Sequence, residues 1–269
     1  MEINRSNINE LLNSNGIRPD KDYGQNFLVE PDISQRIVNS LNIEKEDTVL
    51  EVGPGLGSLT HYLSKFKNEI TLVDIDYKMT DFLKETYAKE KLHIINNDIR
   101  KVDVSNYKKI IGNLPYNITT ELIQYFLLNA QSAERMVFMI QSETFAHFSD
   151  VSSKEYGPTS VLIHLLGNID RLFTVKAGSF IPVPKCNSIV FAINLDARAD
   201  RLASIKAFKL SKQLFINRRK TIQNNLTNYL KNKDLALAAL NKLGINPQLR
   251  PEQISPETYL RISEFLESK

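Results

Sequence analysis

The sequence predicts an α/β protein in which a Rossmann-like domain is followed by a small all-helical domain. Short apolar segments rich in β-branched residues alternate with helical patterns from Thr48 onward. The first of these segments runs directly into a glycine-rich turn. Beyond about Asp200 the apolar residues keep only helical spacing. We therefore expect one domain over residues 1–196 and a helical domain over residues 197–269.

The segment ahead of the sheet predicts a short helix, an arm and a second helix. The first helix and the arm fall within residues 1–20. Gly24 marks a turn, and Gln25 and Asn26 follow it with amide side chains that can hydrogen-bond a ligand. Pro31 can then open the second helix, because its missing N–H is not needed in a first turn.

The first strand, Thr48–Val52, ends in a Gly-x-Gly-x-Gly turn that includes Gly53 and Gly55. Glycine lets the backbone approach a ligand without a Cβ in the way. Ser58 is the expected N-cap of the helix that follows. Dinucleotide sites use Gly-x-Gly-x-x-Gly instead. This difference, together with the acidic Glu51 before the turn, favours S-adenosylmethionine over a nicotinamide cofactor.

The second strand is expected over residues 70–74 and ends on an acidic side chain. An acidic residue about 20 positions beyond a glycine turn is where a ribose hydroxyl pair is held. Asp74 and Asp76 are both candidates, and Asp74 lies nearer to the strand end.

The third and fourth strands, near residues 92–95 and 109–111, also run into polar side chains. Asp98 follows the third strand, where a carboxylate can accept a hydrogen bond from an adenine amino group. Asn113 follows the fourth strand, so four successive strands end in a glycine, two carboxylates and an amide. In an open α/β sheet, ligands bind outside these carboxyl ends.

The tetrapeptide Asn113-Leu114-Pro115-Tyr116 suits the methylation of an adenine amino group. That amine is a poor nucleophile, because its lone pair is delocalised into the ring. The side-chain carbonyl of Asn113 and the backbone carbonyl of Leu114 can accept its two N–H bonds and aim the lone pair. Tyr116 offers a flat face for a base taken out of its stack, and Phe180 is the candidate for the opposite face.

The rest of the chain continues the alternation before it becomes helical. We expect helices over residues 119–129, 142–148 and 159–166 and strands over residues 135–140, 169–175 and 188–195. Further helices are expected within residues 208–215, 226–230 and 235–243.

Composition limits the class of protein. No apolar run approaches the roughly 20 residues that span a bilayer. The single cysteine, Cys186, rules out an intrachain disulfide and fits a reducing, cytoplasmic compartment. The four histidines are scattered without metal-ligand spacing, so no metal is expected. A monomer is expected.

Positive charge is concentrated late in the chain. The net charge is only +3, but residues 198–250 contain 12 Lys and Arg against 2 Asp and Glu. Such segregation indicates a polyanionic partner. Arg218, Arg219 and Lys220 lie inside this block and are candidate RNA-binding residues. On a helix these three would point about 100° apart, so we expect only one or two of them to meet phosphate.

Taken together, these motifs resemble the ribosomal RNA adenine dimethyltransferases, and specifically their small-subunit branch. The resemblance covers nearly the whole chain, from about Gly16 to about Leu260. The segments that carry it are Gly24–Leu28, Glu51–Gly57, Gly112–Ile118, Tyr156–Gly157, Phe180–Lys185 and Phe215–Thr221. The fold it implies is that of a class I methyltransferase.

The resemblance implies an enzyme that uses S-adenosylmethionine to dimethylate two adjacent adenosines in the 3′-terminal hairpin of small-subunit (16S) rRNA. The rRNA, alone or in a pre-30S subunit, is then its partner, with no role for a membrane. Lys185 joins the candidate RNA-binding residues. The candidate cofactor-binding residues are Gln25, Asn26, Leu28, Gly53, Gly55, Asp74, Asp98 and Asn113.

The sequence departs from the family pattern at three places. It has Asp74 at the ribose position, where Glu is more frequent. It has Ser142 where Lys is usual, and Cys186-Asn187-Ser188 where Val-Asp-Ser is common. Asp74 still supplies a carboxylate, whereas the absence of a lysine at position 142 bears on how RNA docks.

Three other functions fit parts of the sequence. A large-subunit rRNA adenine methyltransferase that confers macrolide resistance shares the fold. A non-catalytic rRNA-binding assembly factor on the same fold is the second, and the intact Asn113 and Tyr116 argue against it. A nicotinamide-dependent oxidoreductase is the third, and the spacing of the glycines disfavours it.

Overall fold

The structure, a computed structural model, describes residues 1–20, 24–151 and 154–268. The chain forms two compact units. The first comprises Met1–Glu143 and Asp170–Asn194, and the second comprises Thr144–Ile169 and Leu195–Lys269. Among the described residues, no helix is long and apolar enough to cross a membrane.

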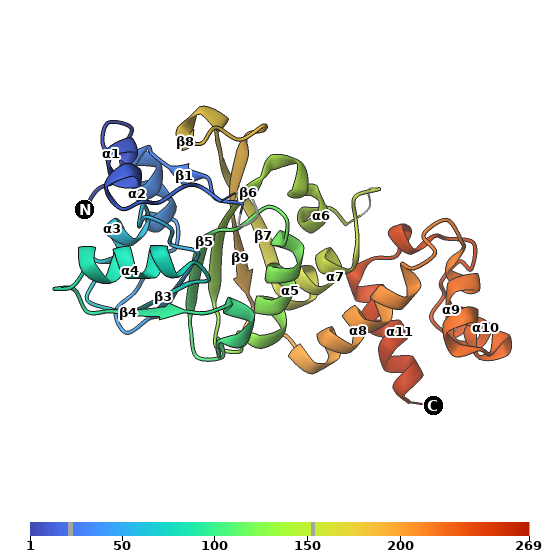
Figure 1. Ribbon diagram of the computed structural model, residues 1–269. Helices are drawn as coiled ribbons and strands as arrows, with labels where there is room; N and C mark the ends of the chain where they lie inside the picture. Colours follow the sequence, from blue (N-terminus) through green and yellow to red (C-terminus); the bar gives the residue numbers. More distant parts are fainter. Residues whose placement is uncertain (21–23, 152–153, 269) are drawn as a thin grey trace. The chain divides into compact units, whose positions relative to one another are not determined.

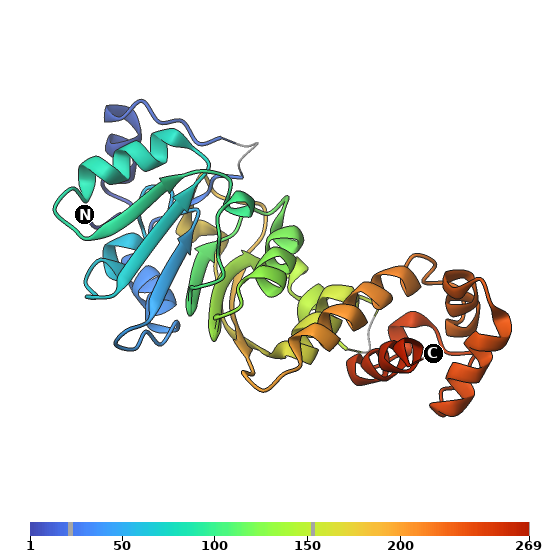
Figure 2. The same cartoon turned by 90° about the horizontal axis from the view of Figure 1, so that it is seen from below.

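A seven-stranded sheet forms the centre of the α/β part of the chain (Figure 1). Its strand order is β4-β3-β2-β5-β6-β9-β7. The pairs from β4 to β6 are parallel, and β9 is antiparallel to β6. The strands are β2 (Thr48–Val52), β3 (Glu69–Asp74), β4 (Leu92–Asn96), β5 (Lys109–Asn113), β6 (Arg135–Gln141), β7 (Gly167–Val175) and β9 (Ser188–Leu195). Figure 2 shows the strands from β4 to β5 side by side.

Helices flank this sheet, and a short two-stranded ladder joins the arm to the later part of the first unit. The helices are α1 (Ile8–Ser14), α2 (Pro31–Asn39), α3 (Thr60–Leu63), α4 (Tyr77–Thr86) and α5 (Thr119–Asn129), with short 3₁₀ turns at Ile99–Lys101 and Ala177–Ser179. In Figure 1, α4 runs alongside β3 and β4. The ladder pairs β1 (Phe27–Leu28) antiparallel with β8 (Phe180–Ile181).

The strands form where the sequence predicts them, because β-branched residues suit a sheet that is buried on both faces. Of the five residues of β2, all but Thr48 are buried. β5 passes so close to β2 that a Cβ on Gly112 would lie 2.6 Å from the carbonyl oxygen of Val52. Glycine at this position therefore allows the two central strands to approach each other just before the site.

The helix expected from Ser58 onward begins later than predicted. α3 covers only Thr60–Leu63, with Leu59 at the N-cap position. Ser58 does not cap it, since its hydroxyl donates instead to the carbonyl oxygen of Leu28 at 2.7 Å. Gly57 has φ +89°, which is not helical, so the helix cannot begin before the glycine turn ends. The predicted N-cap was therefore wrong.

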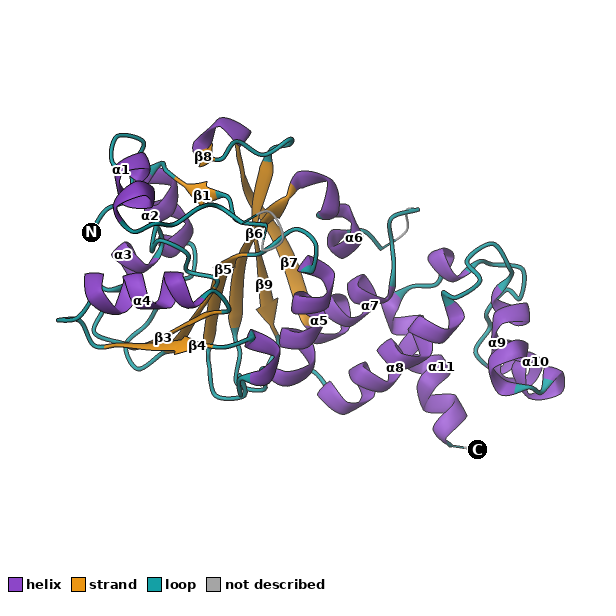
Figure 3. Cartoon of the chain, viewed as in Figure 1, coloured by secondary structure: helices purple, strands orange, loops and turns teal. Residues whose placement is uncertain are grey.

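The second unit is helical (Figure 3). Its helices are α6 (Ala146–Ser149), α7 (Pro158–Leu166), α8 (Arg201–Leu214), α9 (Ile222–Leu230), α10 (Lys233–Lys242) and α11 (Pro256–Glu267), with a 3₁₀ turn at Pro251–Gln253. Another 3₁₀ turn, at Ser142–Thr144, precedes α6. α7 packs with α8 and α11, and Tyr156 and Val161 lie in the same core as residues of α8 to α11.

The division at residue 196 therefore needs correction for one segment. The sequence grouped α6 and α7 with the first domain because they precede β7 and β9 in the chain. The structure places Thr144–Ile169 in the second unit. The physical reason is that the apolar side of α7 is buried against α8 and α11, which sequence order alone does not reveal.

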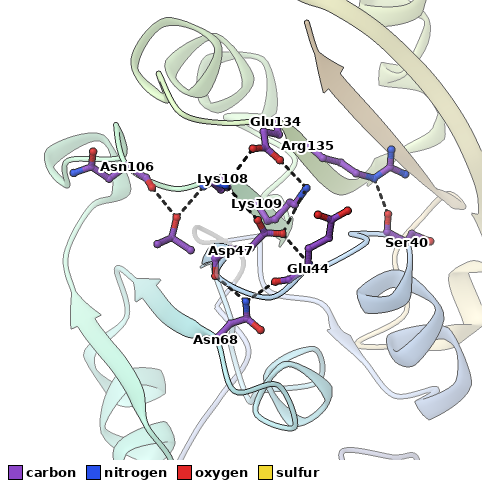
Figure 4. A network of polar contacts seen from close by, with 10 residues as sticks. Ser40, Glu44, Asp47, Asn68, Asn106, Lys108, Lys109, Glu134 and Arg135 are labelled. Carbon is purple, nitrogen blue, oxygen red and sulfur yellow. Dashed lines mark hydrogen bonds and ion pairs between the residues drawn. The ribbon is translucent and has the colours of Figure 1, made fainter. Parts of the chain in front are cut away.

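A polar network lies at the amino end of β5, the end away from the glycine turn (Figure 4). Lys109 is buried, and its ammonium lies 3.6 Å from Asp47 Oδ2 and 3.1 Å from Glu134 Oε2. Asp47 is also buried, and it accepts a hydrogen bond from the backbone N–H of Glu44 at 2.8 Å. The buried lysine is stabilised because two carboxylates compensate for its lost hydration.

We predict that Asp47→Asn destabilises the fold, because the amide keeps the bond from Glu44 but removes the buried counter-charge of Lys109. The expected loss in the free energy of unfolding is about 1.5–3 kcal/mol, as for hydrogen bonds to charged groups. Urea unfolding measures it. Lys45→Gln is the control, since the Lys45–Glu46 pair is exposed and should change stability by less than about 0.5 kcal/mol. Equal losses in the two variants would contradict a stabilising role for Asp47.

Candidate active site

One cavity of the first unit lies at the carboxyl ends of β2, β3, β4 and β5. The predicted convergence of four strand ends is confirmed, since Gly53, Asp74, Asp98 and Asn113 all line this cavity. The other predicted cofactor residues, Gln25, Asn26, Leu28 and Gly55, line it as well. The arm of residues 24–28 therefore contributes one wall, and the strand ends contribute another.

The glycine turn is fastened to the end of β3 through Asp74. The backbone N–H of Gly55 donates to Asp74 Oδ2 at 3.1 Å, and the N–H of Asp76 donates to Oδ1 at 2.9 Å. Gly55 has φ +54°, and a Cβ there would lie 3.3 Å from the ring of Phe27. Burial raises the pKa of Asp74 to about 6, despite these two hydrogen bonds.

Of the two ribose candidates, Asp74 lines the cavity, whereas Asp76 holds other parts of the protein. Asp76 caps α4 by accepting from the N–H of Lys78, and its Oδ2 accepts from Gln25 Nε2 at 2.9 Å. The other end of the Gln25 amide accepts from the N–H of Asp20 at 2.9 Å. Gln25 thus ties the arm to α4, a role that its amide character alone did not predict.

Asp98 is held by a cation that the sequence analysis missed. Arg100 Nε donates to both carboxylate oxygens of Asp98, at 2.9 and 3.1 Å, and Arg100 also pairs with Glu121 on α5 at 2.6 Å. The hydrogen bonds from Arg100 lower the pKa of Asp98, so this carboxylate stays ionised. Arg100 lines the cavity. Its position two residues after Asp98 was the only sequence signal for this pair.

The Asn113 side chain has one satisfied end and one unsatisfied end. Its Nδ2 donates to the backbone carbonyl of Asn26 at 3.2 Å, which fixes the orientation of the amide. Its Oδ1 is buried, and no described residue hydrogen-bonds to it. Buried acceptors are rarely left without a partner. The amide thus presents an acceptor that is suited to a donor on a ligand.

The other predicted catalytic residues lie outside the lining of this cavity. Leu114 is buried, and its N–H donates to the carbonyl of Met139 at 3.1 Å. The Tyr116 hydroxyl lies 3.3 Å from Ser188 Oγ, and burial raises the pKa of that hydroxyl. Phe180 has no exposed surface, because its pairing with Leu28 turns the ring into the core. A base-covering role for Phe180 would require the ring to become exposed.

A second missed group is Glu51, which the sequence marked only as the acidic residue before the turn. It lines the cavity with 1% of its surface exposed. Thr60 Oγ1 donates to its Oε2 at 2.7 Å. Burial raises the pKa of Glu51 to about 8, with a smaller contribution from the nearby Asp74. Its place one residue before Val52, on a central strand, was the signal for burial.

The basic residues predicted to bind RNA do not lie on a helix. Arg218, Arg219 and Lys220 are in the turn between α8 and α9, so the argument from helical spacing was wrong. Arg218 donates to the backbone carbonyls of Lys154 and Tyr156 at 2.7 and 3.0 Å. Arg219 and Lys220 are exposed, as is Lys185 in the first unit. No cluster of described side chains has the composition of a metal site.

Comparison with known proteins connects these features to one family. The sequence model of the family described as ribosomal RNA adenine dimethylase matches residues 17–268. The chain is 34% identical to the ribosomal RNA small subunit methyltransferase A of Malacoplasma penetrans, over 94% of this chain and 93% of the relative. It is 36% identical to the protein of that name from Neisseria meningitidis, over 93% and 96%.

Two solved structures share the fold. A dimethyladenosine transferase from Plasmodium falciparum superposes with a TM-score of 0.77 and 22% identity, covering 90% of this chain and 98% of that one. The 23S rRNA methyltransferase ErmE superposes with a TM-score of 0.70 and 24% identity, covering 90% and 100%. These likenesses indicate an α/β methyltransferase fold.

The burial of Glu51 predicts a pH dependence of stability. Its pKa is about 8 in the folded protein and about 4.3 in an unfolded chain. The folded state therefore binds more protons between these values, and its stability falls as the pH rises. Glu51→Gln cannot titrate, so its stability relative to the wild type should rise with pH by up to about 1.4 kcal/mol per unit.

Urea unfolding at pH 5.5, 6.5 and 7.5 measures this difference. Glu69→Gln is the matched control, because Glu69 is exposed at the amino end of β3. Its stability should stay parallel to that of the wild type. A Glu51→Gln curve that also runs parallel to the wild type would show that Glu51 is already ionised in the folded protein.

Proposed function

The chain belongs to the ribosomal RNA adenine dimethylase family, and we propose that it dimethylates two adjacent adenosines in the 3′-terminal hairpin of small-subunit (16S) rRNA. It is an S-adenosylmethionine-dependent rRNA adenine dimethyltransferase. The relatives named above carry the small-subunit designation at 34–36% identity, which supports the small-subunit rRNA as substrate. The enzyme acts during ribosome biogenesis in the cytoplasm and works as a monomer.

The observation that carries this proposal is the buried, unpartnered Oδ1 of Asn113. An adenine amino group offers two N–H donors, and Oδ1 accepts one of them. The backbone carbonyl of Leu114 accepts the other. With both N–H bonds held, the nitrogen lone pair is directed at the incoming methyl carbon. The arrangement is fixed before the base arrives, because Asn26 holds the other end of the Asn113 amide.

The residues around the cavity fit S-adenosylmethionine. Gly53 and Gly55 leave the turn without side chains where a ligand approaches the backbone. Asp74 accepts from the ribose hydroxyls, and Asp98 accepts from the adenine amino group of the cofactor. When bound, the cofactor supplies an electrophilic methyl group on a sulfonium. The protein contributes orientation and electrostatics to a direct displacement, so covalent catalysis is not required.

Aromatic rings hold the target base once it has left its stack. Tyr116 follows the Asn113 amide closely in the chain, and its hydroxyl is anchored at Ser188. The anchored ring offers a stacking face, which stabilises a base by about 1–3 kcal/mol. Phe180 supplies the opposite face if the ring becomes exposed. After transfer, the methylated amine is acidic enough to lose its proton to water, so no strong base is needed.

We assign rRNA binding to the helical part of the chain within residues 197–269, and catalysis to the α/β unit, Met1–Glu143 and Asp170–Asn194. The basic block supports this assignment, with 12 Lys and Arg against 2 Asp and Glu over residues 198–250. Arg219, Lys220 and Lys185 are exposed and meet phosphate groups. Arg218 has an internal role, because it holds the backbone of residues 154 and 156.

We predict that Asn113→Ala lowers the rate of methyl transfer about 10²–10³-fold, the usual cost of removing one preorganised hydrogen-bonding group. RNA affinity should change little, because the lost contact is to one base. Transfer of labelled methyl groups to 16S rRNA, with mapping of the methylated adenosines, measures the rate. Asn106→Ala is the control, since Asn106 is exposed and far from the strand ends that form the site. A fully active Asn113→Ala would refute the carbonyl role. A wild-type protein that bound rRNA but transferred no methyl groups would favour the alternative of a non-catalytic rRNA-binding assembly factor.

We predict that Arg219→Gln/Lys220→Gln weakens rRNA binding and flattens its salt dependence. Each phosphate contact contributes about 0.9 log units of affinity per log unit of salt on duplex nucleic acid. Filter binding over a salt series measures the slope, and the melting temperature should stay unchanged. Arg218→Gln should behave in the opposite way, with a lower melting temperature and an unchanged slope. A double variant with an unchanged slope would place the RNA surface elsewhere on the basic block.

A further inference from the structure

The charges around the cavity do not balance. Three carboxylates line it, those of Glu51, Asp74 and Asp98. Arg100 is the one Lys or Arg among the described residues that line it, and Asp98 and Glu121 already engage its guanidinium. No Lys, Arg or His of the described chain forms an ion pair with Glu51 or Asp74. Among the residues that the structure describes, the cavity therefore holds two carboxylates without a counter-ion.

Both of these carboxylates are shielded from water. Glu51 is 1% exposed and Asp74 is 8% exposed. Asp74 accepts hydrogen bonds from the backbone N–H groups of Gly55 and Asp76, and Glu51 accepts one from the hydroxyl of Thr60. All of these donors are neutral, so none supplies a positive charge. Two neighbouring buried carboxylates without a cation cannot both ionise at low cost.

The other titratable groups described near Glu51 and Asp74 do not supply a positive charge to this pair. Asp76 acts on Asp74 and has the same sign of charge. The charge of Glu51 acts on the Tyr87 hydroxyl, just after α4. This hydroxyl is neutral, because burial raises its pKa. On α3 the neighbour of Glu51 is the uncharged Thr60. On β5, Lys109 lies at the opposite end of the strand and pairs with Asp47.

We propose that the Glu51–Asp74 pair holds one proton in the cofactor-free enzyme and releases it when a cationic cofactor binds. The pair would then select the sulfonium of S-adenosylmethionine over the neutral thioether of S-adenosylhomocysteine. This inference rests on the cofactor assigned under the proposed function. It adds a role for Glu51 that hydrogen bonding to the cofactor does not require.

The proton balance of the step is simple. Before binding, Glu51 carries the proton and Asp74 is ionised, in line with a pKa of about 8 for Glu51 and about 6 for Asp74. Binding brings in one positive charge, and the carboxyl group of Glu51 gives its proton to solvent. After methyl transfer the sulfur is neutral, so Glu51 takes up a proton again. Without the ion pair, the affinity for S-adenosylhomocysteine is lower than that for S-adenosylmethionine.

Calorimetry of cofactor binding at pH 7, in two buffers with different ionisation enthalpies, counts the protons released. The wild type should release up to one proton more than Glu51→Gln on binding S-adenosylmethionine. On binding S-adenosylhomocysteine, the wild type and Glu51→Gln should release the same number of protons. Proton exchange by the amino group of each ligand cancels in this difference. Glu51→Gln keeps the side-chain shape and an acceptor for Thr60, and Glu69→Gln is the matched control.

Glu51→Gln should also weaken S-adenosylmethionine binding about tenfold, the equivalent of one pKa unit, and leave S-adenosylhomocysteine affinity unchanged. Equal proton release by wild type and variant, or equal weakening for both ligands, would overturn the proposal. If Glu51→Gln does not fold, the wild type alone decides the question, because it should release up to one proton more on binding S-adenosylmethionine than on binding S-adenosylhomocysteine. Wild-type protein that binds neither ligand would contradict the proposed function itself, whereas binding without proton release would contradict only this inference.

Discussion

The parallel pairing of β4, β3, β2 and β5 brings a glycine turn, two carboxylates and an amide to one edge of the sheet. Each group sits where its strand ends, so its position follows from the register of the strands. The close approach of β5 to β2 is possible because residue 112 is glycine. The arm then closes the site through the carbonyl of Asn26, which orients the Asn113 amide. The chemistry of the site thus depends on backbone packing as much as on the side chains themselves.

The buried charges at the two ends of the central strands differ in whether a charge of opposite sign lies beside them. At the amino end of β5, Lys109 is surrounded by Asp47 and Glu134, and the charges are compensated within the protein. At the carboxyl end, Glu51 and Asp74 are buried, and no cation of the described part of the chain pairs with them. A fold can tolerate such a pair by keeping a proton on it, and that state costs stability as the pH rises. This imbalance is what suits the site to a positively charged ligand.

The helical unit shows how adjacent basic residues acquire different roles. Arg218 is turned inward by the carbonyls of residues 154 and 156, and its guanidinium lies over the ring of Phe215. That contact holds the turn between α8 and α9 in place. Arg219 and Lys220 are left exposed on the same turn. One arginine therefore stabilises the turn that presents the next two cations to solvent.

The sequence by itself determined the strands, the glycine turn and the polar residues at the strand ends, because these follow from local patterns of β-branched residues, glycine and polar side chains. It determined the family as well, through motifs such as Asn113–Tyr116. The tertiary structure alone decided which groups share partners: Arg100 with Asp98, Gln25 with Asp76, and Glu51 with Thr60. It also decided that Thr144–Ile169 packs with the C-terminal helices and that Phe180 lies in the core. Those outcomes depend on contacts between segments far apart in the chain and on the loss of water around buried charges, neither of which local residue patterns encode.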